Sequence, residues 1–155
     1  MRKLIALLAA ILLSLTMMGQ EGGAAAGRGK AVRVGADASA DYFIPVTGFG
    51  PVSAGLGVRV RYGRPDQWVN LIGGLRFIYG SRLQGFQIPL LANVNLIRAE
   101  ALSAYLGAGY EFDFIGTYWG CMKFQTGVAV GQNMDIRLFY KPYQGDLGLG
   151  FTYYF

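Results

Sequence analysis

The sequence predicts an all-β fold, an eight-stranded antiparallel up-and-down transmembrane β-barrel, and three observations carry this prediction. The chain is 53% hydrophobic, yet beyond its first 18 residues the apolar side chains are interleaved with polar ones and form no second long run. Short turn-forming segments separate eight alternating stretches, and an even number of strands suits a closed bacterial barrel. The last stretch alternates up to the terminal residue, so that Phe151, Tyr153 and Phe155 share one face.

The N-terminal residues have the composition of an export signal. Arg2 and Lys3 precede an apolar run over residues 4–18, and small residues follow. The run is shorter than the roughly 20 residues that a membrane-spanning helix needs, and this order of features is typical of a cleavable secretory signal peptide. We expect a signal peptide over residues 1–19, with cleavage after Gly19 or as late as residue 26. A flexible periplasmic leader over residues 20–30 and the barrel over residues 31–155 would follow.

Each expected strand places bulky apolar side chains on one face and small or polar ones on the other, because side chains alternate along a strand. In the first strand Val32, Val34 and Ala36 oppose Arg33 and Gly35. Turn-forming residues join the strands as consecutive hairpins. The expected strands span residues 31–42, 51–62, 67–79, 85–96, 101–114, 118–130, 134–141 and 146–155.

The third and sixth expected strands are the least regular. In the third, Trp68 lies on the polar face with Asn70 and Arg76, and in the sixth, Trp119 lies on the polar face with Cys121. The alternation therefore predicts that both tryptophans point into the barrel. With both termini in the periplasm, the turns near residues 63, 98 and 132 face the periplasm, and the four loops between them face outside.

The bulky apolar face is expected on the outside of the barrel. An eight-stranded barrel is only wide enough for side chains to fill its interior, and the polar face combines glycines with charges of both signs. A continuous apolar belt suits lipid, and closure leaves no strand edge unpaired in hydrocarbon. A soluble lipocalin-like carrier, with the apolar face inward, is the alternative. Aromatic residues gather at both ends of the apolar face, as interfacial girdles do: Tyr42, Tyr79, Phe86, Phe112, Phe114, Tyr118 and Tyr140 at one rim, and Tyr62, Tyr153 and Phe155 at the other.

The inward face carries charges of both signs, and we expect them to pair because a lone buried charge is costly. Such a network would plug the lumen, and a narrow channel or porin-like ion path is the alternative. The predicted network comprises Arg33, Asp37, Asp41, Arg59, Arg61, Arg76, Glu111, Asp113, Lys123, Asp135 and Arg137.

The composition argues against enzymatic and metal chemistry. The chain contains no histidine, which removes histidine-based triads and metal sites. The single Cys121 excludes an internal disulfide and a multi-cysteine metal site. We predict no catalytic residue, no cofactor and no metal. Loss of Arg2 and Lys3 with the signal peptide leaves 12 basic residues against nine acidic ones, too mild an excess for nucleic-acid binding.

Three short motifs carry a resemblance to a known family. The segment FQIPLL from Phe86 resembles the "IPLL" strand of small outer-membrane β-barrel proteins of the Bacteroidota, the PorT-like outer-membrane barrel family. The segment LGAGY from Leu106 is similar to the glycine-rich fifth strand of that family. The terminal strand resembles the recognition signal of the barrel-assembly machinery, which makes Phe151, Tyr153 and Phe155 the expected assembly signal.

The resemblance implies a location and partners but no reaction. It points to the outer membrane of a Gram-negative cell, reached by signal-peptide-directed export. The implied partners are outer-membrane lipid, the barrel-assembly machinery during biogenesis and an unidentified envelope protein. The family has no general catalytic residues to carry over. The expected function is therefore structural, accessory or surface-binding in the cell envelope.

Overall fold

The computed structural model of the protein describes residues 32–45, 50–64, 66–80, 84–99, 101–114 and 119–155. The predicted signal peptide and leader, Tyr118 and residues 46–49, 81–83 and 115–117 of the predicted outer loops lie outside these residues. Among the described residues, no helix is long and apolar enough to cross a membrane.

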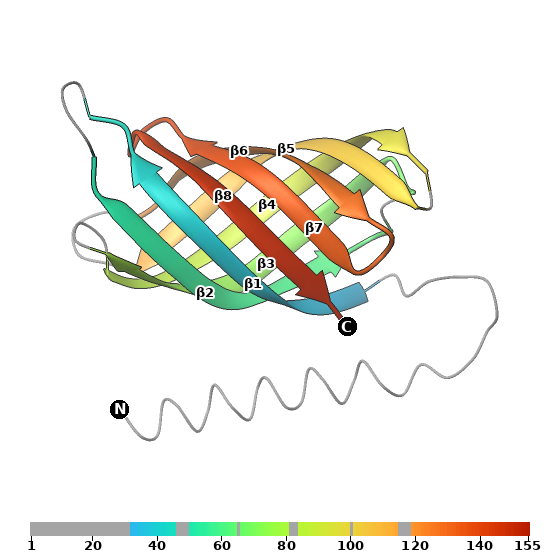
Figure 1. The fold of residues 1–155 in the computed structure, drawn as a ribbon, viewed down its shortest axis with the longest axis horizontal. Coiled ribbons are helices and arrows are strands. Elements are labelled where there is room, and N and C mark those ends of the chain that lie inside the picture. Colours follow the sequence, from blue (N-terminus) through green and yellow to red (C-terminus); the bar gives the residue numbers. More distant parts are fainter. Residues whose placement is uncertain (1–31, 46–49, 65, 81–83, 100, 115–118) are drawn as a thin grey trace, which may run out of the picture.

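Eight antiparallel strands form one closed barrel, which confirms the predicted fold class. Each strand pairs with the next along the chain, and the last pairs with the first, so that the two lie side by side in Figure 1. We call the end at which β1 begins and β8 ends the turn side, and the opposite end the loop side. The strands are β1 (Val32–Phe43), β2 (Val52–Tyr62), β3 (Val69–Gly80), β4 (Gln84–Arg98), β5 (Leu102–Phe114), β6 (Cys121–Val130), β7 (Met134–Lys141) and β8 (Asp146–Tyr154).

The C-terminal strand closes the barrel. β8 is paired with β1 from Gly35↔Tyr154 to Phe43↔Asp146 and with β7 from Met134↔Tyr153 to Lys141↔Asp146. Beyond the ladder, the backbone N–H of Phe155 donates to the carbonyl of Val34 at 2.9 Å. On the other edge, the N–H of Tyr154 donates to the carbonyl of Asn133 at 2.6 Å, so both edges of β8 are hydrogen-bonded to the end of the strand.

The polarity of the barrel is inverted relative to a soluble domain. In β8 buried and exposed residues alternate without interruption, and the buried ones are the small and polar set. The outward side chains Leu56 and Leu149 are 68% and 57% exposed, whereas Arg76 and Glu111 are 2% and 0% exposed. The side chains that fill the interior are therefore mainly polar, and the apolar ones form the outer surface.

The prediction that Trp68 and Trp119 point inward is wrong. β3 begins at Val69 and β6 at Cys121, so both tryptophans lie before their strands. The alternation of side chains along a strand therefore does not determine where they point. Trp68 is 62% exposed and stacks under the guanidinium carbon of Arg98, 3.5 Å from the ring centroid. Trp119 is 89% exposed, and Gly120 after it has φ +130°, which breaks the extended backbone before the strand starts.

β4 is longer than predicted because it contains an irregularity. Its register with β5 shifts between Asn95 and Ile97, so β4 continues to Arg98 instead of ending at Leu96. Leu96, Ile97 and Arg98 are all exposed. A bulge of this kind inserts an extra residue and disturbs the alternation at the rim of a barrel.

Candidate functional site in the barrel lumen

The lumen holds a balanced set of buried charges. Among the described residues six basic and six acidic side chains are buried, and Arg33 at the turn side is half-buried. A buried charge is tolerated only where opposite charges and hydrogen bonds compensate the loss of water. The arrangement of these charges therefore defines the interior. The buried set is Asp37, Asp41, Arg59, Arg61, Arg76, Glu111, Asp113, Lys123, Asp135, Arg137, Lys141 and Asp146.

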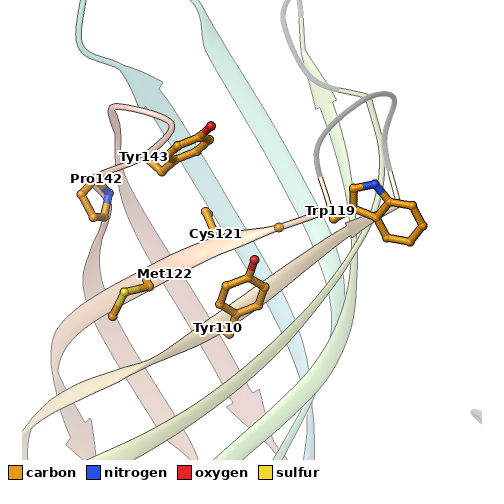
Figure 2. Close-up of a pocket in the computed structure, with 7 residues that line it drawn as sticks. Tyr110, Trp119, Cys121, Met122, Pro142 and Tyr143 are labelled. Carbon is orange, nitrogen blue, oxygen red and sulfur yellow. The ribbon is translucent and has the colours of Figure 1, made fainter.

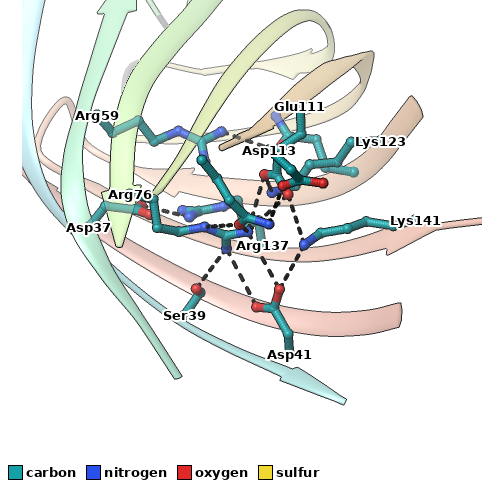
Figure 3. Close-up of polar contacts among 12 residues, drawn as sticks. Asp37, Ser39, Asp41, Arg59, Arg76, Glu111, Asp113, Lys123, Arg137 and Lys141 are labelled. Atoms are coloured by element: carbon teal, nitrogen blue, oxygen red, sulfur yellow. Dashed lines mark hydrogen bonds and ion pairs between the residues drawn. The ribbon is translucent and has the colours of Figure 1, made fainter. Parts of the chain in front are cut away.

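Five of these residues form a loop-side cluster, defined as Asp41, Arg76, Glu111, Lys123 and Lys141 (Figure 3). Lys141 Nζ lies 2.8 Å from a carboxylate oxygen of both Asp41 and Glu111. Arg76 Nη2 contacts the same two carboxylates at 3.4 and 3.1 Å, and Lys123 Nζ lies 2.6 Å from Glu111. Each carboxylate thus serves at least two cations, and Glu111 serves three.

Neutral side chains complete the hydrogen bonding around Arg76. Its Nη1 donates to Ser39 Oγ at 2.7 Å, and its Nη2 donates to Gln87 Oε1 at 2.5 Å. The Gln87 amide in turn donates to Asp113 at 2.5 Å, and Gln144 donates to the other oxygen of Asp113 at 2.6 Å. Asp113 is therefore joined to the cluster through amides.

An aromatic ring lies among the three cations of the loop-side cluster. Lys123, Arg76 and Lys141 lie 4.1, 5.4 and 5.6 Å from the centroid of the buried Phe139 ring. The face of an aromatic ring attracts cations, so Phe139 supplements the two carboxylates. Gly148, the cross-strand partner of Phe139 on β8, leaves room for the ring, because a Cβ added at Gly148 would collide with it.

A second group, the turn-side cluster, consists of Asp37, Asp135, Arg137, Tyr105 and Thr152. Arg137 Nη2 lies 2.6 Å from Asp37, and its Nη1 lies 3.7 Å from Asp135. Thr152 Oγ1 donates to Asp37 at 2.5 Å, and the Tyr105 hydroxyl donates to Asp135 at 2.9 Å. Both carboxylates of this cluster therefore already hold a cation and a hydroxyl.

Three further arginines at the turn side bind neutral acceptors. Arg59 donates to Gln125 Oε1 at 3.1 Å, and Arg61 donates to the carbonyl of Gln132 at 2.7 Å. Arg33 donates to the Gln132 side chain at 2.7 Å and to Asn133 at 2.9 Å. Among the described residues these three arginines form no ion pair.

The structure thus divides the eleven residues of the predicted network. It brings seven of them into direct ion pairs, joins Asp113 through amides, and leaves Arg33, Arg59 and Arg61 with neutral partners. The prediction omitted Lys141 and Asp146, although the alternation that selected the other charges places both on the inward face. Lys141 is the more consequential omission, because it bridges Asp41 and Glu111.

A hollow of about 740 Å³ lies at the loop-side rim between β6 and the β7–β8 turn (Figure 2). The β6–β7 ladder ends at Phe124↔Tyr140, whereas β6 remains paired with β5 as far as Cys121. Pro142 follows β7 directly and has no N–H with which to extend the ladder. The lining residues are Tyr110, Trp119, Gly120, Cys121, Met122, Pro142 and Tyr143.

The described residues contain no group of three or more His, Cys, Asp or Glu side chains arranged to hold a metal ion. Cys121 is buried and free.

These features define a class: a small closed β-barrel with a lumen full of charged side chains and an apolar outer surface. No protein-family model and no curated protein matches the chain. Among solved structures, a chain described under "De novo design of transmembrane beta-barrels" matches with a TM-score of 0.54 and 15% identity. The match covers 83% of this chain and 100% of the designed one. At this identity the likeness concerns the barrel fold, and the resemblance to the PorT-like family stays a prediction.

Proposed function

We propose that the protein is an integral outer-membrane β-barrel with a plugged lumen and a structural, accessory or surface-binding role in the cell envelope. The observation that carries the proposal is the inverted polarity of the closed barrel. Leu71, Leu90 and Leu106, from three different strands, are each more than half exposed. Monomeric soluble proteins rarely expose contiguous apolar patches larger than a few hundred Å². Burial in lipid is the environment that this surface suits.

The distribution of exposed aromatic residues supports the same placement. Tyr62, Trp68 and Phe155 lie at the turn side with exposures of 60 to 64%. At the loop side Tyr79 and Phe114 are each 65% exposed. Aromatic rings favour the boundary between lipid and water, and transmembrane barrels carry a girdle of them at both interfaces.

The charged lumen argues for a plugged barrel and against the two alternatives. A lipocalin-like carrier needs an apolar cavity, whereas most of the buried side chains here are polar or charged. A channel needs a continuous polar path, whereas the loop-side cluster ties β1, β3, β5, β6 and β7 together across the lumen. We expect a flat current trace from the purified protein in planar bilayers. Stepwise single-channel conductance would support the porin-like alternative instead.

Fractionation and one pair of variants test the membrane placement. The protein should be recovered with the outer membrane and should require detergent for extraction; recovery in the aqueous fraction would overturn the proposal. Leu106→Arg, in the middle of β5, should destabilise the barrel in lipid by about 2–4 kcal/mol, because a charge then faces hydrocarbon. The control Ile97→Arg lies at the turn-side rim and should change stability by about 0–1 kcal/mol. Equal effects in urea titrations of vesicle-embedded protein would contradict the assignment of the lipid face.

The proposed assembly partner is the barrel-assembly machinery, which would read the terminal strand. Deletion of Phe155 should lower the amount of protein in the outer membrane and leave export to the periplasm intact. Replacing the similarly exposed rim residue Tyr62 by Phe is the matched control, because it leaves the terminal strand unchanged. Normal outer-membrane levels of the deletion variant would mean that Phe155 is not part of the assembly signal.

A further inference from the structure

The buried charge of the lumen is unevenly distributed along the barrel axis. Four arginines lie toward the turn side, where the only buried carboxylates among the described residues are Asp37 and Asp135. Both carboxylates are engaged by Arg137, with Thr152 and Tyr105 as further donors. The turn-side end therefore holds a positive excess that no described side chain neutralises. The four arginines are Arg33, Arg59, Arg61 and Arg137.

Several hydrogen-bond donors at this end have no acceptor among the described residues. The Nε atoms of Arg33, Arg59 and Arg61 and the hydroxyl of Tyr154 make no hydrogen bond to that part of the chain, although each atom is shielded from solvent. Arg59 and Arg61 are each 2% exposed, and Tyr154 is 0% exposed. Buried polar atoms without a hydrogen-bond partner are uncommon in native proteins and indicate a bound water, ion or ligand. The three arginine Nε atoms can only donate, and the Tyr154 hydroxyl can donate as well, so an acceptor would satisfy all four groups.

The strand register places these donors next to one another. Gly35 of β1 is paired with Arg59 on one side and with Tyr154 on the other, so no side chain separates them. One step nearer the rim, Arg33 is paired directly with Arg61. The Arg61 guanidinium carbon lies 4.4 Å from the centroid of the Tyr154 ring. The four side chains therefore form one patch on neighbouring strands β8, β1 and β2.

From this geometry we propose that the turn-side end of the lumen binds one small oxyanion, such as phosphate or a carboxylate, between Arg59, Arg61 and Tyr154. An oxyanion supplies both missing quantities, negative charge and several acceptor lone pairs. Guanidinium groups form strong charge-assisted hydrogen bonds with such anions. A water molecule would satisfy single donors but would leave the positive excess in place.

The turn between β6 and β7 forms the entrance to this site. The side chain and carbonyl of Gln132 hold Arg33 and Arg61, and Asn133 holds Arg33. Arg33 and Gln132 are both half-buried, so the mouth is in contact with solvent. An anion arriving from the turn side would meet Arg33 first and would reach Arg59 after Gln132 moves aside.

Anion titrations of the full-length protein in detergent micelles test this site. Phosphate, sulfate and acetate should each be compared with chloride at constant ionic strength, by thermal unfolding and by calorimetry. For at least one oxyanion we expect saturable binding in calorimetry. The same anion should raise the thermal stability in proportion to the logarithm of its concentration above the dissociation constant, as binding to the folded state alone requires. Which anion binds tightest then separates a phosphate-like ligand from a carboxylate.

Variants assign the binding to the proposed residues. Arg59→Gln should weaken binding about tenfold or more, the expected result of losing a charge-assisted hydrogen bond. Tyr154→Phe removes one donor without removing charge, so it should weaken binding by a smaller factor and remains informative if Arg59→Gln does not fold. Arg64→Gln is the control, since Arg64 lies at the same end but is paired with Asp66 outside the lumen. No saturable effect of any oxyanion, or equal binding by wild type and both lumen variants, would overturn the proposal. Because the readout is binding in micelles, it is independent of whether the protein proves to be an outer-membrane component.

Discussion

The two ends of the lumen compensate their buried positive charges in different ways. At the loop side, three cations share two carboxylates, and every cation contacts at least one of them at 3.1 Å or less. At the turn side, Arg33, Arg59 and Arg61 use amide and carbonyl oxygens as acceptors. Both ends are polar and buried, yet only the loop side neutralises its charges within the protein. The two ends therefore differ in the partners of their buried cations, which are carboxylates at the loop side and, for three arginines, neutral oxygens at the turn side.

This difference has an energetic consequence. Removing one partner from a buried ion pair is strongly destabilising, because the other charge remains without compensation. Removing a buried cation that has only neutral partners deletes a hydrogen bond and also a desolvated charge. We therefore expect that replacing an acidic residue of the loop-side cluster lowers the free energy of unfolding most. Replacing one of the turn-side arginines that have neutral partners should lower it only slightly.

The largest effect is expected for Glu111→Gln. The substitution keeps the shape of the side chain but removes the carboxylate that Lys123 contacts, while Arg76 and Lys141 keep Asp41. The free energy of unfolding should fall by about 3–5 kcal/mol, measured by urea titration of the vesicle-embedded protein in phosphate-free buffer. A loss below about 1 kcal/mol, the scale of an exposed pair, would mean that the loop-side cluster is solvated and not sealed.

An intermediate effect is expected for Asp37→Asn. Arg137 loses its 2.6 Å partner but retains Asp135 at 3.7 Å and the Thr152 hydroxyl at 2.8 Å. Since a second carboxylate remains, the loss of stability should be about 1–3 kcal/mol in the same titration. A loss as large as that of Glu111→Gln would erase the proposed difference between the two ends.

A small effect is expected for Arg59→Gln in phosphate-free buffer. The change removes one hydrogen bond to Gln125 together with a buried cation that has no ion-pair partner among the described residues. Stability should change by no more than about 1 kcal/mol. The matched variant Arg76→Gln, which removes a cation held by two carboxylates, should be several times more destabilising. Reversal of this order would show that the turn-side arginines, too, are compensated.

The smallest effect is expected for Asp66→Asn. Asp66 pairs with Arg64 at 2.6 Å in the β2–β3 turn, but both side chains are partly exposed to solvent. Exposed ion pairs contribute about 0–1 kcal/mol, and added salt should reduce this further. The variant therefore sets the baseline against which the buried pairs are judged.

Much of the fold followed from the sequence because alternation is a local property. The period of two fixed which side chains share a face in each strand, and turn residues fixed where strands end. The alternation misled at Trp68 and Trp119, because a residue outside the ladder is not bound to point inward. Lys141 and Asp146 follow the same alternation, which places both side chains inside the barrel, so both could have been predicted from the sequence.

The partners inside the lumen could not be derived in the same way. Asp37 meets Arg137 across 100 positions of sequence and Thr152 across 115. Such contacts depend on the register at which β8 closes on β1 and on the glycines that make room. Gly150, for example, has no side chain where the Arg137 guanidinium lies. A single-residue change of register would turn every inward side chain of a strand outward.

The sequence by itself determined the number of strands, the face that each side chain occupies and the absence of histidine chemistry. Only the tertiary structure decided which charges pair with one another, that three cations share two carboxylates at the loop side, and that the Nε donors of three turn-side arginines have no acceptor among the described residues. The physical reason is that strand alternation is set by the backbone of neighbouring residues, whereas charge pairing across a lumen is set by closure of the whole barrel.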